Sequence, residues 1–369
     1  MKKILIVSTV SRQFYLFEQS NIEVLNSLGY EIHAAANFSD ANERLDKLNI
    51  IRHPFDIQRS PFSLKNIKAY KQLKKLMKSE SFDVVHCHSP MGGVLARLVS
   101  KSLGISSVIY TAHGFHFYKG ASLINWLVYY PVERFLSKFT DVLITINKED
   151  YDRGKTFKAR KVIYVPGIGV DTKKFSNASI DKDKKRQELG ISNETVVLLS
   201  IGEMIKRKNH ELVLKALVNV KSQNFLYLIC GRGELEDYLR NLAKTLGIED
   251  KVRFLGYRND IPEICKASDL FVFPSYQEGL PVSVMEAMSA GLPIVCSAIR
   301  GNTDLIENGS GGYLIKPDDV TGFTMSIEKL LIENELRNLM GKRNIKEVKK
   351  YDKEMIKENM EEVYKNFTF

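Results

Sequence analysis

Short apolar runs alternate with longer segments of helical periodicity along almost the whole chain. Nearly continuous apolar runs are typical of strands that are buried on both faces of a parallel sheet, and the segments between them predict covering helices. Strands are expected at 3–8, 31–35, 83–87, 107–111, 141–146, 162–165, 195–201, 225–230, 252–255, 269–273, 293–296 and 312–315. Helices are expected at 12–28, 64–79, 91–103, 122–138, 209–221, 234–246, 282–290 and 320–340. The fold class is therefore α/β.

This alternation forms two series, separated by a polar stretch at 172–194. Each series is long enough for one domain of about 150 residues, so we predict two doubly wound, Rossmann-like domains. The predicted domains are 1–171 and 172–345. Residues 346–369 are predicted to form a helical tail that packs back on the first domain.

Composition adds a charge argument. The 369 residues include 54 Lys and Arg against 44 Asp and Glu, a net charge of +10. Hydrophobic residues at 44% and charged residues at 27% exclude a disordered chain. The positive excess favours an anionic partner, such as a phosphorylated ligand, nucleic acid or an acidic membrane. Because no nucleic-acid recognition module is found, we expect no nucleic-acid partner.

The four cysteines lack the short paired spacing of a disulfide framework or a zinc knuckle, which favours a reducing compartment. The apolar run at 4–7 is too short for a signal peptide, and no window is apolar enough to span a membrane. The predicted location is the cytoplasm, either free or peripherally attached to the inner face of the cell membrane.

The stretch from Phe273 to Met288 concentrates candidate chemistry. A strand ends at Phe273, and after a Pro- and Gly-rich turn a helix is expected to begin near Pro281. The free amides at such a helix start can hold a phosphate. Glu278 and Glu286 flank this position, and carboxylates accept hydrogen bonds from vicinal sugar hydroxyls. Taken alone, the pattern also fits an ordinary strand–turn–helix of any α/β domain.

A second stretch, residues 198–210, leads from a strand through a glycine turn to three consecutive cations, Lys206, Arg207 and Lys208. A helix is expected to begin directly after them. Cations at a helix N-terminus are unfavourable beside its dipole, which indicates that an anion binds there. The alternative interpretation is a solvated basic loop.

Together these segments resemble the second domain of the retaining GT-B glycosyltransferases of family 4, the group 1 transferases, of the bacterial capsule and exopolysaccharide type. The E-x7-E signature of that family stands here as Glu278 and Glu286. Further matching segments are 165–171, 230–233, 254–257, 267–275, 286–293 and 308–313, with looser matches at 82–88 and 111–114. The resemblance implies the GT-B fold, two Rossmann-like domains facing across a cleft. The first domain would bind the acceptor and the second the nucleotide sugar.

The resemblance also implies roles for individual residues. Lys208 is similar to the lysine that clamps the donor diphosphate. Where the family usually has an arginine, this chain has Glu203, and Arg207 is expected to supply the missing charge. His113 matches a histidine near the reacting sugar and is expected to be catalytic. The chain also lacks the Gly-Gly turn that the family carries after its first strand, and has residues 8–12 instead.

The two glutamates of the signature are assigned by the same resemblance. Glu286 would bind the ribose hydroxyls of the nucleotide, and Glu278 would face the donor sugar as a catalytic residue. Gly279 and the backbone amides of Val282 and Ser283 would complete the donor-binding site.

No metal or other cofactor is expected. Cleavage of the bond between sugar and phosphate leaves negative charge on the diphosphate, which cations and helix amides can stabilise. The one evident Asp-x-Asp motif, Asp181 to Asp183, lies in the polar stretch and is interpreted as solvated. Retention of anomeric configuration is implied by the family, and a front-face attack fits the available groups.

The acceptor side is expected to involve Arg12, His88 and His116. His86 and His88 would share one face of a strand, with Cys87 on the other. No third ligand is evident in the sequence, so a metal site there is not predicted. His116 belongs to a loop rich in aromatic residues that follows the strand ending at 111.

The helix predicted at 64–78 carries six lysines around an apolar stripe. One interpretation is a packed helix with a solvated basic face. The other is a surface that binds anionic lipid, because similar transferases use lipid-diphosphate acceptors.

The predicted function is transfer of a sugar from a nucleotide donor, with UDP favoured, to a lipid-linked saccharide in the synthesis of a cell-surface glycan. The alternatives are a nucleotide-sugar epimerase or hydrolase on the same architecture, and a non-catalytic GT-B subunit that only binds a ligand or partner.

Overall fold

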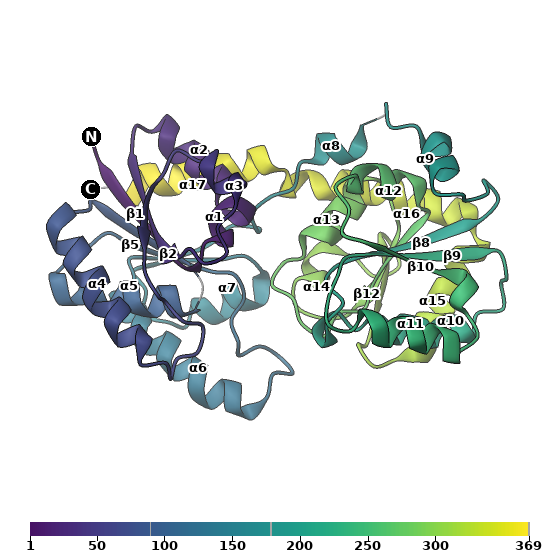
Figure 1. The fold of residues 1–369 in the computed structure, drawn as a ribbon, viewed down its shortest axis with the longest axis horizontal. Coiled ribbons are helices and arrows are strands. Elements are labelled where there is room, and N and C mark those ends of the chain that lie inside the picture. The colour runs from purple at the N-terminus through teal and green to yellow at the C-terminus, as the bar shows by residue number, and fades with distance from the viewer. Residues whose placement is uncertain (89, 178, 368–369) are drawn as a thin grey trace. The chain divides into compact units, whose positions relative to one another are not determined.

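A computed structural model describes residues 1–88, 90–177 and 179–367. The chain divides into two compact units, each built on its own parallel sheet (Figure 1). The N-terminal unit is Met1–Gly169 together with Lys353–Phe369, and the C-terminal unit is Val170–Asp352. The α/β class with two Rossmann-like domains is confirmed. The units separate at 169/170 and 352/353, where we predicted 171/172 and 345/346.

The sheet of the N-terminal unit has the order β3-β2-β1-β4-β5-β6-β7, and all its neighbours pair in parallel. The strands are β1 (Lys3–Val10), β2 (Glu31–Asn37), β3 (Ile51–Pro54), β4 (Val84–His88), β5 (Val108–Ala112), β6 (Val142–Thr145) and β7 (Lys161–Tyr164). The edge strand β3 was not predicted. Its side chains are largely exposed, so it lacks the apolar run that marks the other strands.

Helices cover both faces of this sheet (Figure 1). They are α1 (Arg12–Phe17), α2 (Gln19–Ser27), α3 (Glu43–Asp46), α4 (Lys65–Glu80), α5 (Pro90–Leu103), α6 (Leu123–Leu136), α7 (Lys148–Gly154) and α17 (Lys353–Phe367), with a 3-10 turn, η1 (Ser137–Phe139). The single helix predicted at 12–28 is wrong. It is broken at Glu18, whose backbone leaves the helical region at φ −107° and ψ 1° while its carboxylate is fully buried.

The last helix belongs to the N-terminal unit. Ile356, Met360 and Tyr364 of α17 are buried in the same core cluster as Ile22 of α2. In Figure 1, α17 (yellow) lies beside α2. The end of the chain therefore contributes buried side chains to a core that is otherwise formed by residues from the other end.

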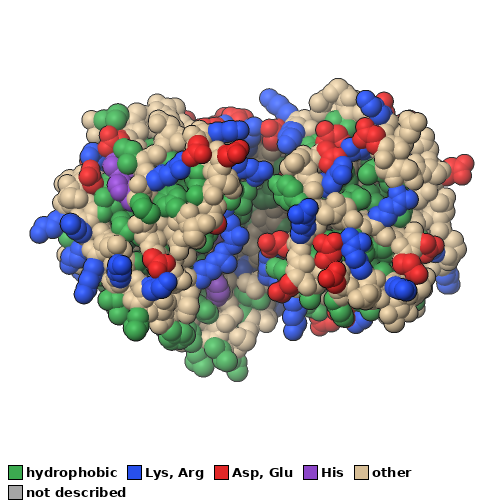
Figure 2. Space-filling view, in the orientation of Figure 1, with side chains coloured by type: hydrophobic (Ala, Val, Ile, Leu, Met, Phe, Trp, Pro, Cys, Tyr) green, Lys and Arg blue, Asp and Glu red, His purple; other side chains and the backbone are tan. Residues whose placement is uncertain are grey.

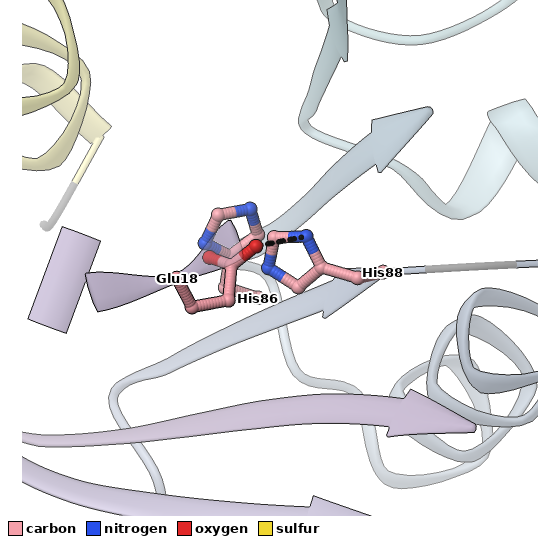
Figure 3. Close-up of side chains that lie close together, drawn as sticks. All are labelled: Glu18, His86 and His88. Atoms are coloured by element: carbon pink, nitrogen blue, oxygen red, sulfur yellow. Dashed lines mark ion pairs between the residues drawn. The ribbon is translucent and has the colours of Figure 1, made fainter. Parts of the chain in front are cut away.

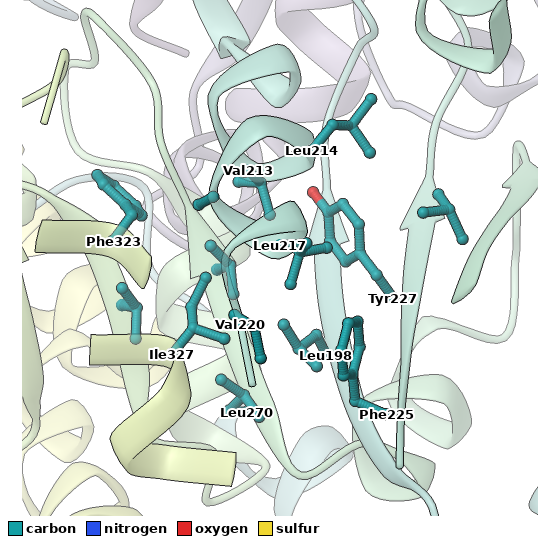
Figure 4. Packing of buried hydrophobic residues seen from close by; sticks show 14 of the residues in the cluster. Leu198, Val213, Leu214, Leu217, Val220, Phe225, Tyr227, Leu270, Phe323 and Ile327 are labelled. Atoms are coloured by element: carbon teal, nitrogen blue, oxygen red, sulfur yellow. The ribbon is translucent and has the colours of Figure 1, made fainter. Parts of the chain in front are cut away.

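The sheet of the C-terminal unit has the order β10-β9-β8-β11-β12-β13, again all parallel. The strands are β8 (Val196–Ile201), β9 (Phe225–Cys230), β10 (Val252–Gly256), β11 (Leu270–Phe273), β12 (Ile294–Ser297) and β13 (Gly312–Ile315). Leu198 and Tyr227 of the sheet belong to one buried core cluster with Leu217 of α10 and with Phe323 and Ile327 of α15 (Figure 4).

The helices of this unit are α8 (Thr172–Ser176), α9 (Lys182–Glu188), α10 (His210–Val218), α11 (Glu236–Thr245), α12 (Ile261–Ala267), α13 (Val282–Ser289), α14 (Asn302–Leu305), α15 (Val320–Ile332) and α16 (Asn334–Glu347). Three 3-10 turns complete the unit: η2 (Lys206–Lys208), η3 (Glu249–Lys251) and η4 (Val348–Tyr351). The segment predicted as one helix at 320–340 is therefore two helices, which meet at Glu333.

The described residues of the polar stretch at 172–194 include two short helices, α8 and α9. Arg186 of α9 is buried and donates to the Asp269 carboxylate at 2.6 Å and to the backbone oxygen of Ala267 at 3.0 Å. Asp181 caps α9 by accepting from the Lys184 amide at 2.9 Å. The Asp-x-Asp motif is thus a helix start, where acidic residues are favoured by the dipole.

Candidate active site

In both units the candidate residues follow strands on either side of the point where the strand order reverses. In the C-terminal unit β8 and β11 are neighbours, and Lys208 and Glu278 lie in the segments that follow them. In the N-terminal unit Arg12 follows β1, and His88 ends the neighbouring strand β4. Ligands of doubly wound sheets bind at this position, because the connecting segments diverge there and leave a crevice.

In the C-terminal unit, the Glu278 carboxylate forms ion pairs with two basic side chains. Its Oε1 accepts from Arg207 Nη1 at 2.8 Å and from Lys208 Nζ at 2.9 Å. The Glu278 and Lys208 side chains are only 10% and 12% exposed, so both charges are partly withdrawn from water. A second anion that entered beside Lys208 would meet a positioned and poorly hydrated ammonium group.

The turn that carries Lys208 is fixed on both sides. Asn209 has a left-handed backbone at φ 55°, and its side-chain amide donates to the backbone oxygens of Pro274 at 3.2 Å and Pro317 at 3.1 Å. Tyr276 donates its amide to the Arg207 oxygen at 2.9 Å. The Lys208 ammonium lies 4.7 Å from the centre of the Phe273 ring. The two segments that hold Lys208 and Glu278 are therefore bonded to each other.

Arg300, which the sequence analysis did not single out, supports Glu278 from a third segment. Its guanidinium Nε donates to the Glu278 backbone oxygen at 3.1 Å. The next residue, Gly301, packs so closely on Gly279 that a Cβ atom there would lie 2.4 Å from the Gly279 oxygen. The predicted donor residue Gly279 thus sits in a turn that only a glycine at 301 permits.

Glu286 lies one turn inside α13, a helix that begins with Val282 and Ser283 after Pro281. Proline has no side chain that can cap a helix, so the first amides are left for another acceptor. Burial raises the pKa of the Glu286 carboxyl to about 7, against a smaller lowering effect of Lys174. Hydroxyl donors of a ligand that bind the carboxylate form would stabilise the ionised state and lower the pKa of this group.

Glu203, where the family usually has arginine, is exposed. It lies in a tightly packed turn, because a Cβ atom on Gly231 would come 1.9 Å from the Gly202 oxygen. The Glu278 carboxylate is instead contacted by Arg207. The expectation that Arg207 replaces the missing arginine stays a prediction.

The N-terminal unit contains a buried polar cluster around Glu18 (Figure 3). Glu18 Oε1 lies 3.2 Å from His88 Nδ1 and accepts from Gln13 Nε2 at 2.9 Å. Its Oε2 accepts from Asn21 Nδ2 at 2.7 Å. The break between α1 and α2 brings this carboxylate to the histidines of the neighbouring strand.

His113 belongs to the same cluster. Its Nε2 lies 3.0 Å from Gln13 Nε2 and 3.1 Å from His88 Nδ1. Burial lowers the pKa of both His88 and His113, so both rings are neutral near pH 7. Because the Gln13 amide nitrogen is a donor, the hydrogen-bond pattern assigns the His113 proton to Nδ1. The His113 side chain is 25% exposed, whereas that of His88 is fully buried.

The structure supplies the third ligand that the sequence did not reveal for a metal site at His86 and His88. Ligand atoms of Glu18, His86 and His88 lie within 4.8 Å of one another, so this group could hold an ion. However, His86 Nδ1 is 2.9 Å from the Tyr364 hydroxyl and His86 Nε2 is 2.8 Å from Thr111 Oγ1. An ion would have to displace one of these bonds.

The remaining acceptor-side candidates lie in different surroundings. Arg12 is 3.9 Å from Asp40 and its side chain is 43% exposed. The His116 ring stacks on Tyr129 with centroids 4.6 Å apart. His113 and His116 both line a pocket of about 250 Å³ in the N-terminal unit, together with Gln13, Pro90, Tyr110, Gly114, Phe115, Phe117, Tyr129 and Glu133. The structure thus brings His88, His113 and His116 to one region and places Arg12 beside Asp40.

Most of the apolar stripe predicted on the helix at 64–78 is covered by the core, although Ile67 is 56% exposed. Leu73 and Met77 of α4 are buried in the core, and Tyr70 and Leu76 pack against the same cluster. Its lysines are exposed, except that Lys74 is half-buried. The structure therefore supports the interpretation as a packed helix with a solvated basic face.

Comparison with solved structures first defines the class of the fold. The HepE protein of Anabaena, in complex with UDP, superposes with a TM-score of 0.83 at 19% identity, over 99% of this chain and all of that chain. The two proteins therefore share one fold, and this chain has the GT-B fold.

Family models and relatives then identify the family. Residues 181–347 match "Glycosyl transferases group 1" and residues 3–147 match "Glycosyl transferase 4-like". The chain belongs to the group 1 glycosyl transferases and is a glycosyltransferase. It is 36% identical to the putative glycosyltransferase EpsD of Bacillus subtilis, over 98% of this chain and 96% of that protein. It is 34% identical to the UDP-Gal:alpha-D-GlcNAc-diphosphoundecaprenol alpha-1,3-galactosyltransferase of Escherichia coli, over 76% and 74%.

The described residues form no helix with both the length and the hydrophobicity needed to cross a bilayer.

Replacement of Glu286 by glutamine is expected to remove a pH dependence of stability. A carboxyl whose pKa is higher in the folded state favours folding below its unfolded value of 4.5, and this contribution is lost as the pH rises to about 7. Relative to Glu286→Gln, the wild type should therefore lose about 3 kcal/mol of unfolding free energy between about pH 4.5 and 7.

Urea unfolding at about pH 5 and about pH 8 measures this difference. Glu335→Gln, at an exposed position of α16, is the matched control and should show no such change. An equal effect of Glu286→Gln at both pH values would contradict the burial of this carboxyl.

Proposed function

We propose that this glycosyltransferase moves a sugar from a UDP-linked donor, with retention of anomeric configuration, to a lipid-linked saccharide. The part of this proposal that concerns the donor rests on the contacts of Lys208 and Arg207 with the Glu278 carboxylate. Both cations are held by the loop that precedes α13, a helix whose first amides no side chain of Pro281 can cap.

In this proposal the diphosphate binds Lys208, Arg207 and the amides of Val282 and Ser283. As the bond to the anomeric carbon breaks, negative charge grows on the leaving phosphate. Positioned cations and helix amides stabilise that charge without reorganising. We propose on this ground that the transfer needs no metal or other cofactor. Activity should then persist in the presence of EDTA.

Glu286 and Glu278 would contact different parts of the donor. Glu286 would accept hydrogen bonds from the ribose hydroxyls, which would favour its ionised form. Glu278 would face the donor sugar with Oε2, while its Oε1 keeps Arg207 and Lys208 in place. His113 would be the catalytic group that the N-terminal unit contributes. No carboxylate is assigned as a nucleophile, so we propose front-face attack, in which the leaving phosphate accepts the acceptor proton.

The choice of UDP and of a lipid-linked acceptor is supported by the proteins that the chain resembles. The Escherichia coli relative is named for UDP-galactose and for an acceptor on diphosphoundecaprenol, and the Anabaena structure holds UDP. The pocket beside His113 and His116 is lined by aromatic rings of Phe115, Phe117 and Tyr129. Such rings suit the apolar faces of a sugar.

The test measures UDP release from a panel of UDP-sugars, with and without a short-chain prenyl-diphosphate saccharide. Release that requires the acceptor, together with a product of increased mass and unchanged anomeric configuration of the transferred sugar, supports the proposal. Release without any acceptor would indicate a hydrolase instead. Inversion in the product would exclude the retaining step.

A further inference from the structure

Helix α6 has an unusual exposed surface for a helix of a folded unit. Its residues Leu123, Ile124 and Leu127 are 79%, 70% and 75% exposed. At helical spacing these side chains share one half of the helix surface with Val128, Pro131, Val132, Arg134 and Phe135, all of which are exposed. Arg134 is the one residue of this set that is not apolar. Figure 2 shows hydrophobic side chains gathered at the lower edge of the view, where Figure 1 labels α6.

The opposite face of α6 packs against the rest of the N-terminal unit, so the helix cannot rotate to bury Leu123 and Leu127. Trp126 and Tyr130 pack on Phe117, with ring centroids 5.6 and 5.3 Å away. Glu133 is buried and accepts from Arg97 Nη2 at 2.9 Å and from the Tyr110 hydroxyl at 3.0 Å. A helix that is apolar on its outer side and held on its inner side is expected to be covered by another apolar phase.

The charges around this surface favour an anionic bilayer as that phase. Lys119 precedes the helix, Arg134 lies on its outer face and Lys138 follows it, and all three side chains are exposed. The Lys138 ammonium lies 5.6 Å from the centre of the Phe135 ring. The one acidic residue of α6, Glu133, is turned inward and paired with Arg97. Apolar side chains bordered by cations are the chemistry of a helix that lies in the interface of acidic membranes.

We propose that the outer face of α6 docks the enzyme on a bilayer that contains anionic phospholipid. This helix, rather than the lysine-rich α4, is the docking element, because most of the apolar stripe of α4 packs in the core and only Ile67 of that stripe is exposed. The proposal deepens the proposed function in one respect and rests on it there. Tyr129 and Glu133, on the inner side of α6, line the same pocket as His113 and His116. A saccharide on a membrane lipid would thus meet that pocket beside the bilayer.

The test is flotation of the full chain with vesicles of phosphatidylcholine alone and of phosphatidylcholine mixed with phosphatidylglycerol. Wild type is expected to float with the mixed vesicles, and less so as salt is raised. The double variant Leu123→Ser/Leu127→Ser should bind about a hundredfold more weakly, roughly tenfold per leucine removed from the interface. Lys119→Gln/Lys138→Gln should lower binding to the mixed vesicles by about tenfold.

The matched control is Met325→Ser/Leu339→Ser, which removes two apolar side chains of the C-terminal unit that are 67% and 66% exposed. It should bind as wild type does. Failure of wild type to float with mixed vesicles, or equal binding of the leucine variant, would overturn the proposal. So would a dimer that the leucine variant converts to a monomer, because a second copy would then cover α6.

Transfer assays separate this proposal from the proposed function. The leucine variant should act normally on a water-soluble acceptor and lose activity on the same saccharide embedded in vesicles. Flotation without transfer to any acceptor would contradict the function and leave docking standing. Transfer by the enzyme, together with vesicle binding that is unchanged in the leucine variant, would support the function and contradict docking through α6.

Discussion

Lys208→Ala is expected to lower kcat/KM by about a hundred- to a thousandfold, the range found when one preorganised charge-stabilising donor is removed. The Lys208 ammonium is only 12% exposed and is held 2.9 Å from Glu278. It therefore needs little desolvation or reordering when the diphosphate charge develops. The measurement is UDP release at saturating and at limiting UDP-sugar, because loss of a contact to the transition state lowers kcat as well as kcat/KM.

Lys206→Ala is the control for this experiment. Lys206 belongs to the same 3-10 turn, but its side chain is exposed, so kcat/KM should change by no more than about twofold. The stabilisation of wild type by UDP in thermal unfolding should be reduced in Lys208→Ala and retained in Lys206→Ala. Near-normal turnover of Lys208→Ala would remove Lys208 from the donor site.

His113→Ala is expected to lower kcat by about a hundredfold or more, as loss of a positioned polar group at the reacting centre does. The ring is neutral, is held by Gln13 and His88 at 3.0 and 3.1 Å, and still reaches a pocket. Because the proposed nucleotide contacts all belong to the C-terminal unit, the affinity for UDP should stay unchanged. This separation of kcat from UDP affinity distinguishes a catalytic role from a general loss of folding.

His53→Ala is the histidine control for this experiment. His53 lies on the edge strand β3 and stacks on His33 with ring centroids 5.1 Å apart, and its loss should leave kcat within about twofold. If His113→Ala kept wild-type kcat, or lost UDP binding in parallel with kcat, the assignment of His113 to the reacting sugar would be wrong.

The donor-side candidates could be found in the sequence because they occur in short segments with strong local signals. Glu278 and Glu286 are separated by seven residues across one turn and one helix start, and Lys208 ends a run of three cations. Each signal depends on neighbours in the chain, and the two segments stand in an order that the family shares. The hydrogen bonds of Arg300 and Asn209, by contrast, join segments far apart in the sequence, which no local pattern reports.

The cluster around Glu18 was missed for a related reason. Residues 12–28 have the periodicity of one helix, and a glutamate within a helix usually faces solvent. The break at Glu18 is explained by its partners Gln13, Asn21 and His88, and His88 comes from a strand some seventy positions away in the chain. The energy of that buried network, which local propensity does not contain, outweighs the preference for a continuous helix.

The sequence by itself determined the alternation of buried strands and covering helices, the division into two doubly wound units and the signature that defines the family. These features follow from periodicity and local backbone chemistry, which adjacent residues carry. Only the tertiary structure decided that Glu18 turns inward to the histidines, that Leu73 and Met77 of α4 are buried and that Leu123 and Leu127 of α6 are exposed. Both helices carry apolar residues at helical spacing. Which stripe meets the core depends on packing partners distant in the chain, because burial is a property of the assembled layers and not of a segment.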